Sequence, residues 1–257
     1  MTGTSLALGW RLTIFFGAGV MTGIANGIAG GGTFFSFPTL LAMGIPPLQA
    51  NVSSTVGVVP SFVGGLRASR GRFAAHRVLA RSLILPCVTG TVVGCALLFL
   101  GSPKTFERVV PWLIGTATLL FALAPRITRR LDHIEHSHPA RRWALYAGIF
   151  FTSIYGGYFG AGVGIMLLAV MAVSLPYEIH ELQVLRNMLS IAITSVAAVI
   201  FIVRGHLALE AVYMLLVGTL LGGWLGTLLI QRLSPSWVRA LVVATGLVTT
   251  VHLALQK

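Results

Sequence analysis

Two glycine-rich breaks interrupt apolar segments of the chain, and each exposes backbone N–H groups that suit an anion. The first break contains Gly30–Gly32, and the second contains Gly160 and Gly162. Such breaks end a helix, and irregular backbone is tolerated at membrane depth only where protein or a water-filled cavity surrounds it. A helix that restarts at Thr33 or Val163 points its positive dipole end at that cavity. We therefore favour an anion-binding role for the breaks over close helix packing alone.

A run of polar side chains opens the next apolar segment of the first half. Asn51, Ser53, Ser54 and Thr55 occupy four of five consecutive positions. Capping of a helix N-terminus requires only one such side chain. The run therefore predicts amide and hydroxyl groups that contact a solute.

The counterpart of this run in the second half contains a cation flanked by apolar sequence, Arg186, together with Gln183 and Asn187. The side chain could snorkel to the membrane interface. An arginine inside a membrane is more often functional, and its forked guanidinium matches a sulfonate, phosphate or carboxylate. We predict that Arg186 contacts an anion.

Acidic residues are scarce, and none of the six lies in the middle of an apolar segment. This distribution argues against a cation pathway lined by carboxylates. If transport is coupled to a proton, the clustered titratable candidates are Glu178, His180 and Glu181. Their alternative interpretation is that they are solvated loop residues.

The composition places these groups in a membrane protein. Only 9% of the 257 residues are charged, 56% are hydrophobic and the mean hydropathy is +0.89, whereas soluble domains have about 25% charged residues. Ten of the 18 Lys and Arg residues fall in two short stretches, 67–81 and 126–142. Short basic loops between apolar segments are typical of the cytoplasmic side. Apart from Phe73, the two stretches contain no phenylalanine, tyrosine or tryptophan for base stacking, so we do not expect nucleic-acid binding.

Ten apolar segments follow one another along the chain, which predicts an all-α polytopic membrane protein with eight to ten membrane segments. They are Arg11–Ala29, Phe34–Met43, Val52–Ala68, Leu79–Leu100, Val109–Leu123, Trp143–Phe159, Ile165–Leu175, Leu189–Val203, Ala208–Ile230 and Val238–Leu255. Phe34–Met43 and Ile165–Leu175 are too short to cross a bilayer unaided, and each follows a glycine break. We expect these two to be re-entrant or broken helices.

The chain repeats itself at an offset of 128 to 134 residues. The matches are Thr22–Gly32 with Thr152–Gly162, Pro46 with Pro176, Arg70–Phe73 with Arg204–Leu207, Gly90–Gly94 with Gly218–Gly222, and Arg108 and Gly115 with Arg239 and Gly246. We predict a first membrane repeat at 1–124, a basic cytoplasmic linker at 125–142 and a second membrane repeat at 143–257. The basic loops favour inverted repeats, and parallel repeats stay open if each broken pair counts as one crossing.

The glycine-broken first segment, the run from Gly44 to Thr55, and Leu185-Arg186-Asn187 resemble the sulfite exporter TauE/SafE family. The resemblance covers nearly the whole chain, including its duplication. It implies a multi-pass inner-membrane permease for sulfite, sulfonates or related small organosulfur anions. The family's motif regions also point to Asn26.

The sequence therefore predicts a secondary transporter that binds a small anion at the repeat interface near the bilayer midplane. A passive anion channel and an intramembrane enzyme using Cys87, Cys95, His180 or His252 are the alternatives. We expect no catalytic residue, cofactor or metal, and we interpret His133, His136 and His138 as part of a solvated linker. The expected partners are the anion and the bilayer, with a coupling proton and a homodimer left open. The predicted substrate-binding residues are Asn26, Gly30, Gly31, Gly32, Asn51, Ser53, Ser54, Thr55, Gly160, Gly162, Gln183, Arg186 and Asn187.

Overall fold

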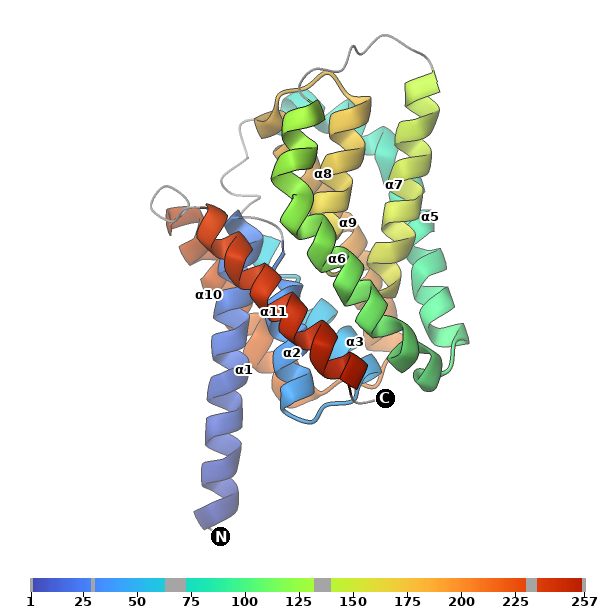
Figure 1. Ribbon diagram of the computed structural model, residues 1–257. Helices are drawn as coiled ribbons and strands as arrows, with labels where there is room; N and C mark the ends of the chain where they lie inside the picture. Colours follow the sequence, from blue (N-terminus) through green and yellow to red (C-terminus); the bar gives the residue numbers. More distant parts are fainter. Residues whose placement is uncertain (1, 29–30, 63–72, 132–139, 230–234, 256–257) are drawn as a thin grey trace.

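The computed structural model describes residues 2–28, 31–62, 73–131, 140–229 and 235–255, and every regular element within them is a helix (Figure 1). The helices are α1 (Thr2–Ile28), α2 (Thr33–Ala42), α3 (Pro47–Val58), α5 (Phe73–Leu100), α6 (Pro103–Leu131), α7 (Ala140–Tyr158), α8 (Val163–Ser174), α9 (Ile179–Arg204), α10 (Leu209–Leu229) and α11 (Pro235–Leu255). Each of the ten predicted apolar segments overlaps one of them. The all-α prediction is confirmed.

Five of the described helices contain a stretch long and apolar enough to cross a membrane. These stretches are Gly9–Ile28, His76–Leu100, Pro103–Leu123, Glu181–Arg204 and Leu209–Gly226. Large apolar side chains such as Leu100, Val78 and Trp143 project outward from the helices and are at least 80% exposed. An apolar exterior of this kind requires lipid as its solvent. The protein is therefore a polytopic membrane protein.

Several helices begin earlier than their apolar segments. Helix α9 starts at Ile179, ten residues before the predicted start, because Glu178 and Glu181 form a capping box at its first turn. Helix α3 starts at Pro47 rather than Val52, since proline suits the first helical position. The predicted boundaries were wrong at these points because polar first turns carry no apolar signal.

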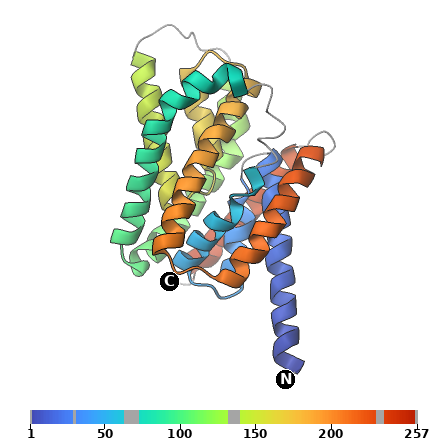
Figure 2. The ribbon, with the colours of Figure 1, turned by 180° about the vertical axis from the view of Figure 1, so that it is seen from behind.

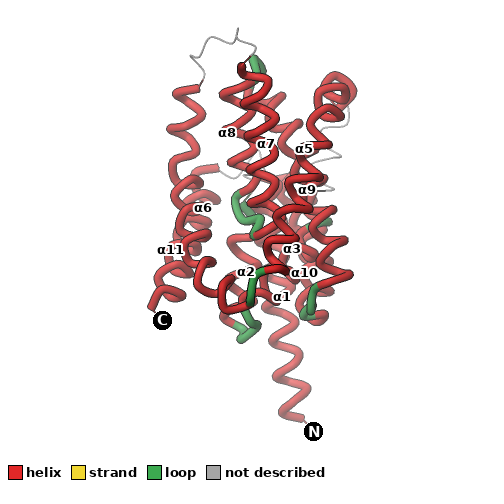
Figure 3. Tube along the Cα trace, turned by 90° about the vertical axis from the view of Figure 1, so that its right-hand side faces the viewer, coloured by secondary structure: helices red, strands yellow, loops and turns green. Residues whose placement is uncertain are grey.

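The chain reverses direction at both glycine breaks. In Figures 1 and 3, α1 and α2 run in opposite directions, and so do α7 and α8. The short helices α2 and α8 therefore begin inside the molecule. This arrangement turns the start of each short helix toward the interior.

Long helices at matching positions in the two halves of the chain run in opposite directions. Helix α1 points upward in Figure 1 and α7 points downward, whereas α5 descends and α10 ascends (Figures 1 and 2). The starts of α5 and α7 and the end of α6 lie at the upper end of Figure 1. We call it the basic end because these helix ends carry Arg77, Arg81, Arg126, Arg129, Arg130, Arg141 and Arg142.

Two glycine-lined helix contacts join the two halves of the chain, and each pairs a helix of one half with a helix of the other. Helix α1 packs on α10, where a Cβ on Gly23 would lie 2.5 Å from the carbonyl oxygen of Thr219. Helix α5 packs on α7, where a Cβ on Gly94 would lie 2.0 Å from the carbonyl oxygen of Ile154. Only glycine permits backbones to approach this closely. The first helix of each half is thus held by a late helix of the other half.

Candidate functional site

The first glycine break is fixed by one amide side chain. The Oδ1 atom of Asn26 accepts a hydrogen bond from the backbone N–H of Gly32 at 2.7 Å, and its Nδ2 atom donates to Oγ of Ser61 at 2.9 Å. Ser61 in turn donates to the carbonyl oxygen of Val58 at 2.6 Å. A Cβ on Gly32 would lie 2.2 Å from the carbonyl oxygen of Thr22. Asn26 therefore ties α1, the start of α2 and the end of α3 together.

The second break is built differently. Gly160 and Gly162 adopt positive φ angles of 81° and 76°, which favour glycine over residues with a side chain. The hydroxyl of Tyr155 donates to the carbonyl oxygen of Ala161 at 2.7 Å. Position 156, which aligns with Asn26, is itself a glycine. The second break is thus formed by backbone conformation rather than by an amide clamp.

A cavity of about 30 Å³ lies between the two breaks. Its walls come from the ends of α1 and α7, the starts of α2 and α8, helix α3 with the residues that follow it, and the first half of α9. The lining residues are Asn26, Thr33, Thr55, Val58, Phe62, Gly156, Gly160, Val163, Gly164, Arg186, Asn187, Ser190, Ile193 and Thr194. A water molecule needs roughly 10–15 Å³ of such volume. The cavity therefore has room for only a few heavy atoms in this conformation.

The polar wall of the cavity is one face of α9. Arg186, Ser190 and Thr194 follow at intervals of four residues, which places them on the same side of a helix. The guanidinium of Arg186 is buried, with 6% of the residue exposed, and donates through Nε (3.3 Å) and Nη2 (2.9 Å) to Oδ1 of Asn187. Among the described residues, no carboxylate forms an ion pair with Arg186.

The starts of two helices meet at the same cavity. Thr33 opens α2, and Val163 and Gly164 open α8. The first N–H groups of a helix have no intrahelical acceptor, and the helix dipole is positive at this end. The cavity is consequently surrounded by a guanidinium, hydroxyls and the positive ends of two helices.

Most of the polar run at the start of α3 is engaged in contacts between helices. Asn51 donates through Nδ2 to the carbonyl oxygen of Tyr158 at 3.0 Å, and Oγ of Ser53 accepts from the backbone N–H of Ala208 at 2.9 Å. Ser54 shares a hydrogen bond with Ser36 of α2. Thr55, by contrast, lines the cavity.

The thirteen predicted site residues therefore occupy five kinds of position. Asn26, Thr55, Gly160, Arg186 and Asn187 line the cavity. Gly31, Gly32 and Gly162 lie within the breaks, and Asn51, Ser53 and Ser54 hold neighbouring helices without lining the cavity. Gln183 is exposed on α9, and Gly30 lies outside the described residues.

Sequence reasoning missed the hydroxyls of Thr33, Ser190 and Thr194. Single hydroxyl residues inside apolar helices resemble ordinary packing residues, and this is why they carried no signal. The signal that could have found Ser190 and Thr194 is their four-residue spacing from Arg186.

The two cysteines of the alternative enzymatic reading lie away from the cavity lining. Cys87 donates through Sγ to the carbonyl oxygen of Leu189 at 3.7 Å, and Cys95 to that of Gly157 at 3.3 Å. Both are fully buried. The side chains of His180 and His252 lie outside the described part of the chain, as do His133, His136 and His138.

Residues 15–253 match the family described as "Sulfite exporter TauE/SafE". The chain belongs to this family. The TauE/SafE protein is 22% identical over 245 residues to a "Probable membrane transporter protein" of Haemophilus influenzae, which covers 93% of this chain and 92% of that one. It is 22% identical over 246 residues to the "Probable membrane transporter protein YfcA" of Escherichia coli, covering 94% and 89%.

A "Probable membrane transporter protein" of a Sinorhizobium species is 28% identical to the TauE/SafE protein over 155 residues, or 60% of this chain and 58% of that one. No solved structure matches it. The family resemblance predicted from the sequence is confirmed. The protein is a multi-pass member of a membrane transporter family.

Proposed function

We propose that this protein is a secondary transporter of a small oxyanion, with sulfite and small sulfonates as the first candidates. The observation that carries the proposal is the buried guanidinium of Arg186, which lines the cavity and pairs with no carboxylate among the described residues. A buried cation without a counterion is costly, and an anion in the cavity would compensate it. The names of the relatives, each a probable membrane transporter, support the same class of activity.

The proposed ligands replace the hydration shell of the anion. Arg186 supplies charge-assisted hydrogen bonds, which are about twice as strong as neutral ones. Thr55, Ser190 and Thr194 supply hydroxyl donors, and the positive dipole ends of α2 and α8 face the same cavity. The small volume favours a compact solute, and a larger sulfonate would require the walls to move apart.

We also propose that the two halves are inverted repeats. The opposite directions of α1 and α7, and of α5 and α10, support this assignment (Figures 1 and 2). The exchanged contacts support it as well, since α1 packs on α10 as α7 packs on α5. Parallel repeats would give equivalent helices the same direction.

The cavity lining supports a site on the pseudo-symmetry axis. Many lining residues pair with one another at the repeat offset. The pairs are Asn26 with Gly156, Thr33 with Val163, Thr55 with Asn187, Val58 with Ser190, and Phe62 with Thr194. A site contributed by equivalent positions of two inverted repeats suits alternating access, because rocking of one half against the other exposes it to either side.

We place the protein in an inner membrane with its basic end toward the cytoplasm. The proposal follows from the concentration of arginine in 67–81 and 126–142, the segments that adjoin the starts of α5 and α7 and the end of α6. The linker at 125–142 would then be cytoplasmic.

Purified protein in liposomes tests the transport function. We expect saturable uptake of labelled sulfite or sulfoacetate that is accelerated by unlabelled anion on the opposite side. Uptake that never saturates and shows no counterflow would instead indicate a passive channel. The absence of flux with any anion would contradict both transport readings.

A further inference from the structure

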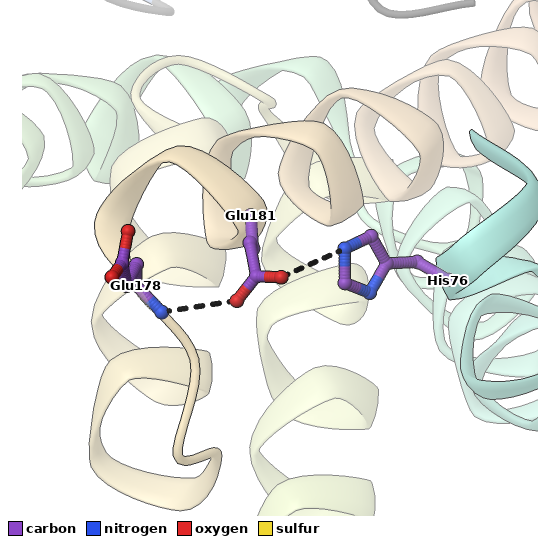
Figure 4. Close-up of polar contacts among 3 residues, drawn as sticks. All are labelled: His76, Glu178 and Glu181. Atoms are coloured by element: carbon purple, nitrogen blue, oxygen red, sulfur yellow. Dashed lines mark hydrogen bonds and ion pairs between the residues drawn. The ribbon is translucent and has the colours of Figure 1, made fainter. Parts of the chain in front are cut away.

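A second buried polar site lies where α5 and α9 begin. Figure 4 shows His76 of α5 directed at Glu181 of α9, with Nε2 and Oε1 3.7 Å apart. The side chain of His76 is 6% exposed, whereas that of Glu181 is 42% exposed. Nδ1 of His76 is buried and has no hydrogen-bond partner. The ring of Tyr177 packs edge-on against the imidazole at 5.2 Å. A buried histidine is thus paired with a half-exposed carboxylate.

The same carboxylate also caps α9. Its second oxygen, Oε2, accepts a hydrogen bond from the backbone N–H of Glu178 at 3.2 Å (Figure 4). Glu178 and Glu181 together form the capping box at the N-terminus of α9. Glu181 therefore connects the imidazole of one half of the chain to the helix that carries Arg186 in the other half.

The distance between the His76 imidazole and the Glu181 carboxylate would change if the imidazole became charged. Their separation exceeds the roughly 3.2 Å upper end of ordinary N–H···O hydrogen bonds. An imidazolium attracts a carboxylate far more strongly than a neutral imidazole does, so protonation would draw the two groups together. Histidine is the side chain best suited to change charge at physiological pH.

We propose that His76 and Glu181 form a proton-binding site that couples anion transport to proton movement. This inference rests on the proposed transport function. One proton passes from water, by way of the exposed carboxylate, to the imidazole, and the net charge of the pair changes from one negative charge to zero. No other bond forms or breaks. Release of the proton restores the anionic pair and loosens the contact between α5 and α9.

The route from this site to the anion site is a single helix. Arg186 follows Glu181 by five residues on α9, a rise of about 7.5 Å. A shift of the first turn of α9 on protonation would therefore reposition the guanidinium in the cavity. His76 and Glu181 also stand at the first residues of two stretches able to cross the membrane. The pair consequently lies where protons from the basic end can reach it.

The charged groups around the pair are few on the described elements. Helix α5 itself carries Arg77 and Arg81, both exposed. On the α9 side stands Glu178, also exposed. Helix α7 contributes the exposed Arg142 and the partly buried Tyr146, and α8 contains no titratable residue. Within the described side chains, Glu181 is the carboxylate paired with His76.

The test uses the full-length protein in liposomes and whichever of sulfite and sulfoacetate the wild type exchanges. Counterflow without a pH gradient measures binding and alternation. Accumulation under a pH gradient, together with an internal pH-sensitive dye, measures coupling, and one pH unit corresponds to about tenfold accumulation per proton. We expect His76→Gln and Glu181→Gln to retain counterflow within about twofold of the wild type and to lose gradient-driven accumulation. The matched controls are His206→Gln and Glu107→Gln, at exposed positions, which should retain both.

Each outcome separates the inference from the proposed function. The wild-type protein could exchange anion without accumulating it under a pH gradient and without moving protons. That result would overturn the coupling site and leave the transport function intact. Variants that keep full gradient-driven accumulation would overturn it too. If His76→Gln does not fold, as judged by gel filtration, Glu181→Gln and the wild-type proton signal still decide. Wild type with no exchange at all would refute transport itself.

Discussion

At the scale of single residues, the cavity is organised around one buried cation. Arg186 is held by its neighbour Asn187, which fixes the guanidinium without neutralising it. The hydroxyl residues Thr55, Ser190 and Thr194 line the same cavity as the guanidinium. We expect such a set to bind an anion in preference to a cation or a neutral solute, because none of the described lining residues is a carboxylate.

Replacement of the cation should abolish transport. Removal of one partner of a buried charge pair costs about 2–5 kcal/mol, so we expect Arg186→Ala to weaken anion affinity by at least roughly 30-fold. Arg186→Lys should recover part of it, since lysine keeps the charge but not the fork. Binding is measured by anion-dependent thermal shift and transport by counterflow. Arg142→Ala, an exposed arginine at the basic end, serves as control, and unchanged affinity in Arg186→Ala would refute the site.

Substitutions at two residues of the same polar run should have different effects, one on anion affinity and the other on stability. Thr55→Val removes a cavity hydroxyl while keeping the shape, and we expect affinity to fall about two- to tenfold with an unchanged melting temperature. Asn51→Ala removes the hydrogen bond to Tyr158 and should lower the free energy of unfolding by about 1–3 kcal/mol. Thermal unfolding and anion binding are measured for both. The opposite pattern would mean that Asn51, not Thr55, contacts the solute.

At the scale of elements, helical geometry explains how much of the site the sequence could predict. Thr55, Val58 and Phe62 share the cavity face of the α3 region, while Ser53 and Ser54 point to other helices. The run of polar residues from Asn51 to Thr55 identified the segment that lines the cavity, but it did not identify which of its side chains face the cavity. Asn51 lies one turn before Thr55, and it is the backbone of α7, a partner distant in sequence, that engages its amide.

The close helix contacts depend on glycine at the crossing points. Gly94→Ala would place a methyl group 2.0 Å from the carbonyl oxygen of Ile154, whereas Gly17→Ala would meet no atom within 4 Å. Overpacking of this kind costs about 1–3 kcal/mol. We expect Gly94→Ala to lower the melting temperature of the detergent-solubilised protein and Gly17→Ala to leave it unchanged or slightly raised. Equal stability of the two variants would contradict the packing described for α5 and α7.

At the scale of the whole molecule, hydropathy identified ten helices because lipid requires long apolar segments. The proposed duplication rests on a sequence offset, whereas the packing of α1 on α10 and of α5 on α7 could not be predicted from the sequence. His76 was missed for the same reason, since 105 residues separate it from Glu181 and only the fold brings α5 onto α9. The candidates Glu178, His180 and Glu181 therefore lacked His76, the partner on which the proposed proton-binding site depends.

The orientation in the membrane has a direct test. In a background in which Cys87 and Cys95 are alanine, we expect a single cysteine at Ser102 to react with a membrane-impermeant maleimide added from outside. A cysteine at Arg142, at the basic end, should react only after the membrane is opened. Both positions are exposed, so the difference reports sidedness. Labelling of Arg142→Cys alone in intact cells would reverse the proposed orientation.

The exchanged glycine contacts also govern the order in which the chain can assemble. Helix α1 is made before its close partner α10, which begins about 180 residues later. At about 5–20 residues per second, α1 waits roughly 10–40 s in the bilayer with its glycine face uncovered. During that interval we expect an insertase or a membrane protease to bind the nascent first half of the chain. A truncated chain that ends before α10 should therefore be degraded, and its cellular level should be lower than that of the full chain.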